Sequence, residues 1–260
     1  MNRIMKQQWD KLGRGVAVAL LGWMLAGSFT AARATLINFD INGYDSLGST
    51  VGPTYSGAQA VGSAGDFWNS VAVDNDDITT FTAWDLKLSD GATTTTVDFT
   101  VTSGSAGKKL VAFRETSYTI DDLYNDGLTV WPTMNSSSPT NIRFTIEGLN
   151  PGNSYDLYLY SSPGAYGNDY AFSTFIIGTT TNQNPAGPPH YVTFTGLQAD
   201  GNGKITGTLY EHVITGGNPG ILNGFQLVGE FTTIVPEPSM ALLFAGGLGV
   251  LWCWRRARRS

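Results

Sequence analysis

Two alternating segments and the turn that joins them occupy residues 142–160: Ile142-Arg143-Phe144-Thr145-Ile146-Glu147-Gly148-Leu149-Asn150-Pro151-Gly152-Asn153-Ser154-Tyr155-Asp156-Leu157-Tyr158-Leu159-Tyr160. Apolar residues take every second position on either side of the Asn-Pro-Gly turn. Because side chains alternate between the two faces of a strand, this period of two predicts two β-strands. In the second, Tyr155, Leu157 and Leu159 share one face.

Alternation continues on both sides of this stretch. Residues 97–102 repeat the pattern, and further strands are expected at residues 36–39, 67–73, 85–89, 170–178, 191–195, 203–211 and 225–231. A short helix is predicted at residues 117–127, capped by Ser117 and ended by Gly127. Residues 181–189, rich in proline, are expected to form an inter-strand loop. Many strands with few helical turns predict an all-β fold, a single jelly-roll-type β-sandwich over residues 35–232.

Three stretches of this domain resemble the galactose-binding-like jelly rolls. They are Asp66-Phe67-Trp68-Asn69, the segment of residues 142–160 quoted above, and Ile221-Leu222-Asn223-Gly224-Phe225-Gln226-Leu227. The resemblance implies a fold that often carries carbohydrate-binding sites.

The N-terminus has the three parts of a secretory signal peptide. Arg3, Lys6, Lys11 and Arg14 precede an apolar region at residues 16–29, and Ala32-Arg33-Ala34 follows as an A-x-A site. Residues 1–34 are therefore predicted to be removed by signal peptidase, with cleavage before Thr35. A retained N-terminal anchor is the alternative.

Residues 233–260 contain a second sorting signal. Pro236-Glu237-Pro238 precedes an apolar run at residues 240–254, and Arg255, Arg256, Arg258 and Arg259 follow it. The run predicts a transmembrane helix, and the arginines place its end in the cytoplasm. The order of motif, helix and arginines resembles the PEP-CTERM tail of exopolysaccharide-producing Gram-negative bacteria. That resemblance implies transient anchoring in the inner membrane, processing by exosortase, and release to the cell surface or medium; a plain C-terminal anchor is the alternative.

The charge between these two ends is strongly acidic. Nine of the 15 basic and two of the 21 acidic residues lie in the ends, so the body carries a formal charge of about −13. Charge of this sign disfavours nucleic acid as a partner. The one cysteine, Cys253, lies in the apolar tail, so the body contains no disulfide.

No constellation in the sequence identifies an enzyme. His190 and His212 are the only histidines, and no Gly-x-Ser-x-Gly motif occurs. Glu115, Glu147, Glu211 and Glu230 are the residues that a glycosidase carboxylate pair would draw on, but a solvated surface is the simpler interpretation. We therefore expect a protein without catalytic residues.

One acidic loop suggests a metal. Asp74, Asp76 and Asp77 gather hard oxygen ligands of the kind that Ca²⁺ prefers. A structural calcium ion is the one cofactor that this loop suggests, and a polar surface turn is the alternative.

Sugar binding requires exposed aromatic faces beside short polar side chains. The segment Tyr166-Gly167-Asn168-Asp169-Tyr170 and Trp131 are the best candidates for a ligand-binding surface. Trp68 is expected in the core, and the direction of Trp84 is ambiguous.

The sequence thus favours an exported surface or matrix protein with a structural or adhesive sandwich associated with exopolysaccharide. The alternative is a carbohydrate-binding module, and an exported polysaccharide hydrolase is third.

Overall fold

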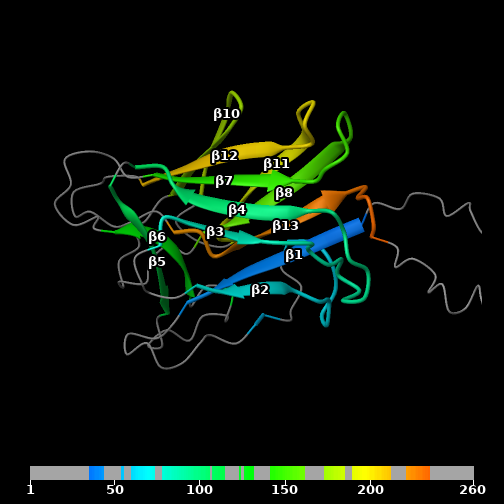
Figure 1. Ribbon diagram of the computed structural model, residues 1–260, viewed down its shortest axis with the longest axis horizontal. Coiled ribbons are helices and arrows are strands. Elements are labelled where there is room, and N and C mark those ends of the chain that lie inside the picture. Colours follow the sequence, from blue (N-terminus) through cyan, green and yellow to red (C-terminus); the bar gives the residue numbers. More distant parts are fainter. Residues whose placement is uncertain are drawn as a thin grey trace, which may run out of the picture. The chain divides into compact units, whose positions relative to one another are not determined.

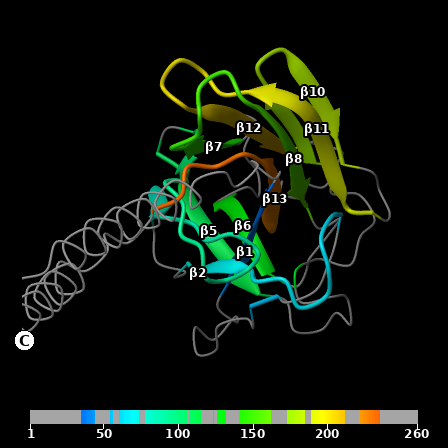
Figure 2. The ribbon, with the colours of Figure 1, turned by 90° about the vertical axis from the view of Figure 1, so that its right-hand side faces the viewer.

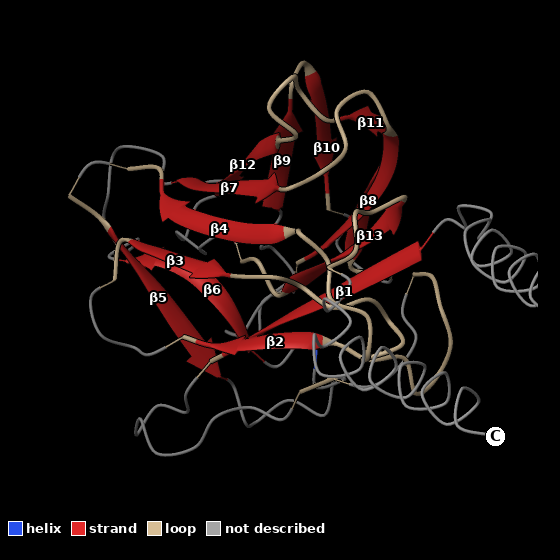
Figure 3. Ribbon diagram, turned by 45° about the vertical axis from the view of Figure 1, so that its right-hand side comes forward, coloured by secondary structure: helices blue, strands red, loops and turns tan. Residues whose placement is uncertain are grey.

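In a computed structural model of the protein, the described residues are 35–43, 54–55, 60–73, 78–105, 107–114, 123, 126–131, 141–161, 173–184, 189–211 and 221–234. They form an all-β structure of thirteen strands (Figures 1 and 3). The predicted all-β class is therefore confirmed. No helix in these ranges is long and apolar enough to cross a membrane.

Two large sheets contain most of the strands. The five-stranded sheet has the order β11 (Tyr191–Gln198), β8 (Ser154–Tyr160), β13 (Gly224–Gly229), β1 (Thr35–Asn42), β2 (Asn69–Ala72). The six-stranded sheet has the order β10 (Thr180–Gln183), β9 (Ser173–Ile177), β12 (Ile205–Glu211), β7 (Asn141–Glu147), β4 (Asp98–Ser103), β3 (Thr80–Ala83). All neighbours are antiparallel except β1 and β2, which are parallel.

The predicted pair of strands at residues 142–160 is confirmed as β7 and β8, but the two strands belong to different sheets. The turn between them is therefore a corner that carries the chain from one sheet to the other. Gly148 has a left-handed φ of 74°, and a Cβ there would overlap the carbonyl oxygen of Thr96. The buried Tyr155 hydroxyl accepts a hydrogen bond from the Asn150 amide at 2.9 Å, which holds the corner closed.

Aromatic side chains join the two sheets across a shared core. The Phe99 ring of β4 lies 5.0 Å from that of Phe39 in β1 and 4.7 Å from that of Phe225 in β13, between ring centroids. All three side chains are fully buried. Apolar residues of both sheets surround them in one continuous cluster. The two sheets therefore face each other as in a β-sandwich.

A hairpin of β5 (Lys109–Arg114) and β6 (Asp126–Trp131) contacts strands of both sheets (Figure 2). The predicted helix end at Gly127 is wrong, because Gly127 lies inside β6 and pairs with Phe113. A Cβ at this position would crowd Ile221 and Asn223, so the glycine permits close packing rather than ending a helix. Leu123 is buried, and the rest of residues 115–125 lies outside the described part.

Two other predictions of strands are corrected. Residues 85–89 form no strand and make one isolated bridge, between Lys87 and Thr94. Conversely, β10 occupies residues 180–183, part of which was predicted as a loop, because a tight turn at Gly178 lets the chain fold back onto β9. The short strands β3, β5 and β6 were also missed.

The face of β1 that points away from the core is buried as well. Asn38, Asp40 and Asn42 alternate with the core residues of this strand, yet all three are nearly inaccessible. The Gln226 amide donates to Asn38 Oδ1 and to the Val61 carbonyl, both at 2.8 Å. Buried polar groups require such partners. A polar network therefore fastens the segment that precedes β2 over the outer face of the five-stranded sheet.

We predict that Phe99→Ala lowers the free energy of unfolding by about 3–5 kcal/mol, because it removes the ring that both sheets share. Urea denaturation measures the loss. Trp84→Ala is the matched control, since Trp84 is 71% exposed and its loss is expected to change stability by about 0.5 kcal/mol or less. Equal effects of the two substitutions would contradict the assigned core.

Candidate functional site

A cleft of about 1000 Å³ lies beside the edge strands of the two sheets. Its lining comes from β2 and the residues before it, from the end of β3 and the residues after it, from Phe39 of β1, and from Thr54 and Tyr55. We call it the edge cleft. It is lined by Phe39, Thr54, Tyr55, Gly65, Asp66, Phe67, Trp68, Asn69, Ser70, Val71, Ala83, Trp84, Asp85, Leu86, Lys87, Ser89, Asp90, Gly91 and Ala92.

The segment after β3 links the two sheets along the cleft. The Leu86 amide donates to the Val97 carbonyl, just before β4, and the Ser89 amide donates to the Leu36 carbonyl in β1, both at 2.8 Å. One partner immediately precedes β4 of the six-stranded sheet and the other lies in β1 of the five-stranded sheet, so the segment does not extend either ladder as a regular strand. This explains why its predicted strand does not form.

The Asn69 side chain fixes one wall of the cleft to the other. Its Nδ2 donates to the Asn38 carbonyl at 2.9 Å and to the Lys87 carbonyl at 2.7 Å. Its Oδ1 accepts the Lys87 amide at 2.8 Å. One side chain thus joins β1, β2 and the segment after β3.

Aromatic residues of the cleft differ in what they expose. Trp84 is 71% exposed and Phe67 38%, whereas Trp68 is only 2% exposed, which confirms its predicted place in the core. The Trp68 ring packs edge-on against Tyr55, with centroids 5.0 Å apart. Trp84 and Phe67 therefore offer apolar faces to a ligand, and Trp68 supports the wall behind them.

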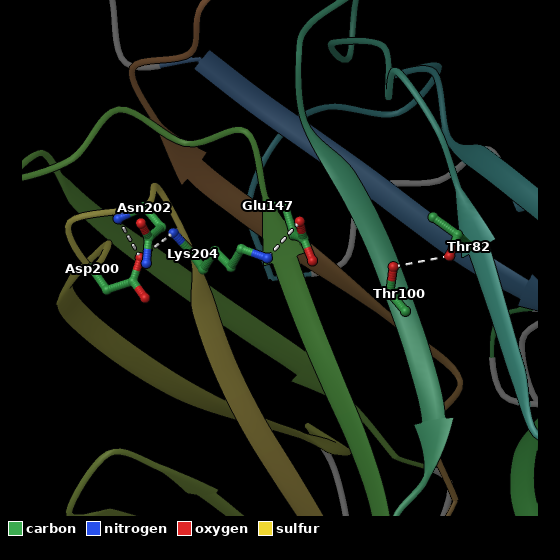
Figure 4. Close-up of polar contacts among 6 residues, drawn as sticks. All are labelled: Thr82, Thr100, Glu147, Asp200, Asn202 and Lys204. Carbon is green, nitrogen blue, oxygen red and sulfur yellow. Dashed lines mark hydrogen bonds and ion pairs between the residues drawn. The ribbon is translucent and has the colours of Figure 1, made fainter.

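The alternation of β3 explains why Trp84 faces solvent. Phe81 and Ala83 pack against the core, so Thr82 and then Trp84 fall on the outer face of the six-stranded sheet. Thr82 lies on this face (Figure 4), and its hydroxyl and that of Thr100 form a hydrogen bond of 3.0 Å. The period of two would have resolved the direction of Trp84 from sequence, had the strand of residues 80–83 been predicted.

Three carboxylates line the cleft, and they differ in the hydrogen bonds that they accept. Asp66 Oδ2 accepts the Ser63 amide at 2.9 Å. Asp90 Oδ1 accepts the Ala92 and Thr93 amides at 2.8 Å, and the Thr93 hydroxyl and amide hold the pKa of Asp90 below its ordinary value. The exposed carboxylate of Asp85 accepts no hydrogen bond within the described residues. Asp85 is thus the cleft carboxylate with its acceptors open to a ligand.

The backbone at Asp85 is left-handed, with φ of 53°. Its amide donates to Asp98 Oδ1 at 2.8 Å, which holds the turn. Aspartate tolerates this conformation better than most residues. The turn ends the extended path of β3 directly after Trp84.

The ligand and metal residues predicted from sequence are not tested by this geometry. Tyr166, Asn168, Asp169 and Tyr170 lie outside the described residues, as do Asp74, Asp76 and Asp77. Trp131 ends β6, and its side chain is not described. The sorting residues are also outside the described part: Ala32, Ala34, Pro236, Glu237, Pro238, Arg255, Arg256, Arg258 and Arg259.

Buried polar groups lie at the two ends of the segment that contains Tyr166–Tyr170. Ser161 follows β8, Ser173 begins β9, and their hydroxyls are 2.6 Å apart in the interior. The Asn184 amide group donates to the Ser161 carbonyl at 2.7 Å. The backbone carbonyl of His190 accepts the Ser161 amide at 3.0 Å. This cluster fixes the two points from which the segment starts and ends.

Glu147, one of the carboxylates considered for catalysis, lies on the outer face of the six-stranded sheet (Figure 4). Its Oε2 is 2.9 Å from the Lys204 ammonium. Lys204 follows a turn in which Asp200 Oδ1 accepts the amides of Asn202 and Lys204, both at 2.9 Å. Glu147 is therefore part of a surface ion pair outside the edge cleft.

No known protein family and no curated protein matches the chain. Among solved structures, the carbohydrate-binding module TmCBM61 in complex with β-1,4-galactotriose matches with a TM-score of 0.25 and 10% sequence identity. The match covers 53% of this chain and 88% of that chain. A likeness of this size does not indicate what the present chain binds.

We predict that His190→Asn weakens the dependence of stability on pH. Burial lowers the pKa of His190, so the unfolded state binds more protons than the folded state near the ordinary value of 6.5. Stability is therefore full above that pH and falls as the pH decreases through it. Asparagine removes the titration and suits the left-handed backbone here, where φ is 59°.

The measurement is the free energy of unfolding by urea at a series of pH values from neutral to about pH 5. The difference in the free energy of unfolding between wild type and His190→Asn at each pH gives the contribution of His190, because the carboxylates contribute equally to both proteins. Parallel curves for the two proteins would contradict the prediction.

Proposed function

We propose that the domain binds a glycan non-catalytically in the edge cleft, with Trp84 as the stacking platform. The observation that carries this proposal is the exposed Trp84 ring in a cleft whose lining also includes short polar side chains, among them Ser70, Asp85 and Ser89. The C–H face of a sugar packs on an aromatic ring, while hydroxyls hydrogen-bond to carboxylate, amide and hydroxyl groups such as those of Asp85 and Ser70. Ligand sites generally combine apolar surface with a few polar groups in this way.

We further propose that this binding serves a surface or matrix protein associated with exopolysaccharide. The signal-peptide pattern and the PEP-CTERM-like tail support export, transient anchoring in the inner membrane and processing by exosortase. The strongly acidic body supports a partner other than nucleic acid. A purely structural or adhesive sandwich is the second candidate, and it predicts no dependence of glycan binding on Trp84.

Trp84→Ala is expected to weaken glycan binding about thirtyfold, the effect of losing about 2 kcal/mol from a central aromatic contact. A glycan array identifies the ligand, and calorimetry measures its affinity. Trp84→Phe is the matched variant, which keeps a smaller ring and part of the affinity. Tyr166→Ala and Tyr170→Ala test the alternative surface: if these abolish binding and Trp84→Ala does not, the edge cleft is not the site.

Intact-mass spectrometry of the protein from its native cell envelope and medium tests the proposed sorting. The expected mature species begins at Thr35 and ends near Pro236–Pro238, because both signals are removed. A species that still ends at Ser260 would mean a permanent anchor and would remove exosortase as a partner.

A further inference from the structure

The charge of the edge cleft is unbalanced. Asp66, Asp85 and Asp90 supply three carboxylates, and Lys87 supplies the one cation among the lining residues. Lys87 forms no ion pair within the described residues, so it does not neutralise any of these carboxylates directly. Asp98, which holds the Asp85 amide, adds a further negative charge next to the cleft. A ligand that enters therefore meets a negative potential.

An ammonium group already lies on an aromatic face in the cleft. The Lys87 Nζ atom is 5.7 Å from the centroid of the Phe67 ring, within the range of a cation–π interaction. The Lys87 backbone is fixed independently by its hydrogen bonds with Asn69. The position of the ammonium therefore depends on the flexible side chain alone, and it lies within cation–π range of a ring that lines the cleft.

The carboxylate that is open to a ligand lines the same cleft as the exposed Trp84 ring. Asp85 directly follows Trp84, and its carboxylate accepts no hydrogen bond within the described residues, whereas Asp66 and Asp90 each accept backbone amides. A sugar stacked on Trp84 would therefore share the cleft with this carboxylate. A protonated amino group is the sugar substituent that gains most from such a neighbour, since it donates charge-assisted hydrogen bonds.

We propose that the edge cleft selects glycans that carry free, protonated amino groups over neutral or acidic glycans. Asp85 is the residue that binds the ammonium group of the ligand. The Lys87 ammonium competes with the ligand's ammonium for the negative potential of the cleft. This inference rests on the proposed glycan-binding function, and it adds the chemical class of the ligand. The same charge disfavours uronic acids and sulfated sugars.

The experiment uses calorimetry with the full-length protein in detergent and three hexamers: β-1,4-linked glucosamine, N-acetylglucosamine and glucose. The measurement is made at mildly acidic pH, where the amino groups of the glucosamine hexamer are charged. The expected result is tightest binding of the glucosamine hexamer. Asp85→Asn should weaken that binding about fivefold, the upper range for an exposed charge pair, and weaken binding of the two neutral hexamers less, because they lose no charge pair.

Asp85→Asn is a mild substitution because asparagine also suits the left-handed backbone. Glu147→Gln is the matched control: it makes the same change of charge on the outer face of the six-stranded sheet, in the ion pair with Lys204, and should not alter binding. Lys87→Met keeps the aliphatic stem and removes the competing ammonium. It should tighten binding of the glucosamine hexamer severalfold, with loss of its cation–π contact to Phe67.

The outcomes distinguish the selectivity for amines from the proposed glycan binding on which it rests. If the neutral hexamers bind as well as the glucosamine hexamer, and Trp84→Ala abolishes all binding, the cleft is a glycan site but the selectivity for amines is wrong. If Asp85→Asn and Glu147→Gln weaken binding of the glucosamine hexamer equally, the selectivity is also wrong, because the effect would then come from the net charge of the protein. If none of the three hexamers binds, the inference fails, and the glycan array decides the proposed function separately.

Discussion

The contact between the Phe99 ring and the rings of Phe39 and Phe225 is the interaction on which the rest of the structure depends. It joins β4 of one sheet to β1 and β13 of the other, with centroid separations of 5.0 and 4.7 Å. Without a disulfide in the domain, the two sheets are held by packing of this kind. The position of one sheet relative to the other then sets the distance between their edge strands, and so the width of the edge cleft.

A second, polar layer gives the cleft its other wall. β1 directs Ile37, Phe39 and Ile41 into the shared core and Asn38, Asp40 and Asn42 to the opposite face, where they are also buried. Asn38 Nδ2 donates to the Phe67 carbonyl at 3.0 Å, and Gln226 holds Val61 above the same face. Trp68 is buried in this layer, and its neighbour Phe67 remains partly exposed. Phe67 and Trp68 are consecutive residues, and their side chains point to opposite sides, as the alternation of an extended chain requires.

Much of the fold was predictable because it depends on local pattern. The alternation in residues 142–147 and 154–160 gave β7 and β8, and similar patterns gave β4, β11, β12 and β13 with small errors at their ends. The failures have physical reasons. Residues 85–89 alternate like a strand but divide their hydrogen bonds between the two sheets. Gly127 resembles a helix end but serves close packing within β6. Short edge strands such as β3 carry too few residues for a period to be recognised.

The sequence by itself determined the all-β class, the acidic charge of the body and the burial of Trp68, because composition and periodicity depend only on which residues follow one another. The tertiary structure alone decided that β7 and β8 lie in different sheets, that the polar face of β1 is covered, and that Trp84, Phe67 and Asp85 line one cleft. The residues of that cleft come from separate parts of the chain. Their meeting depends on how the edges of two packed sheets lie beside each other, and no local pattern records this.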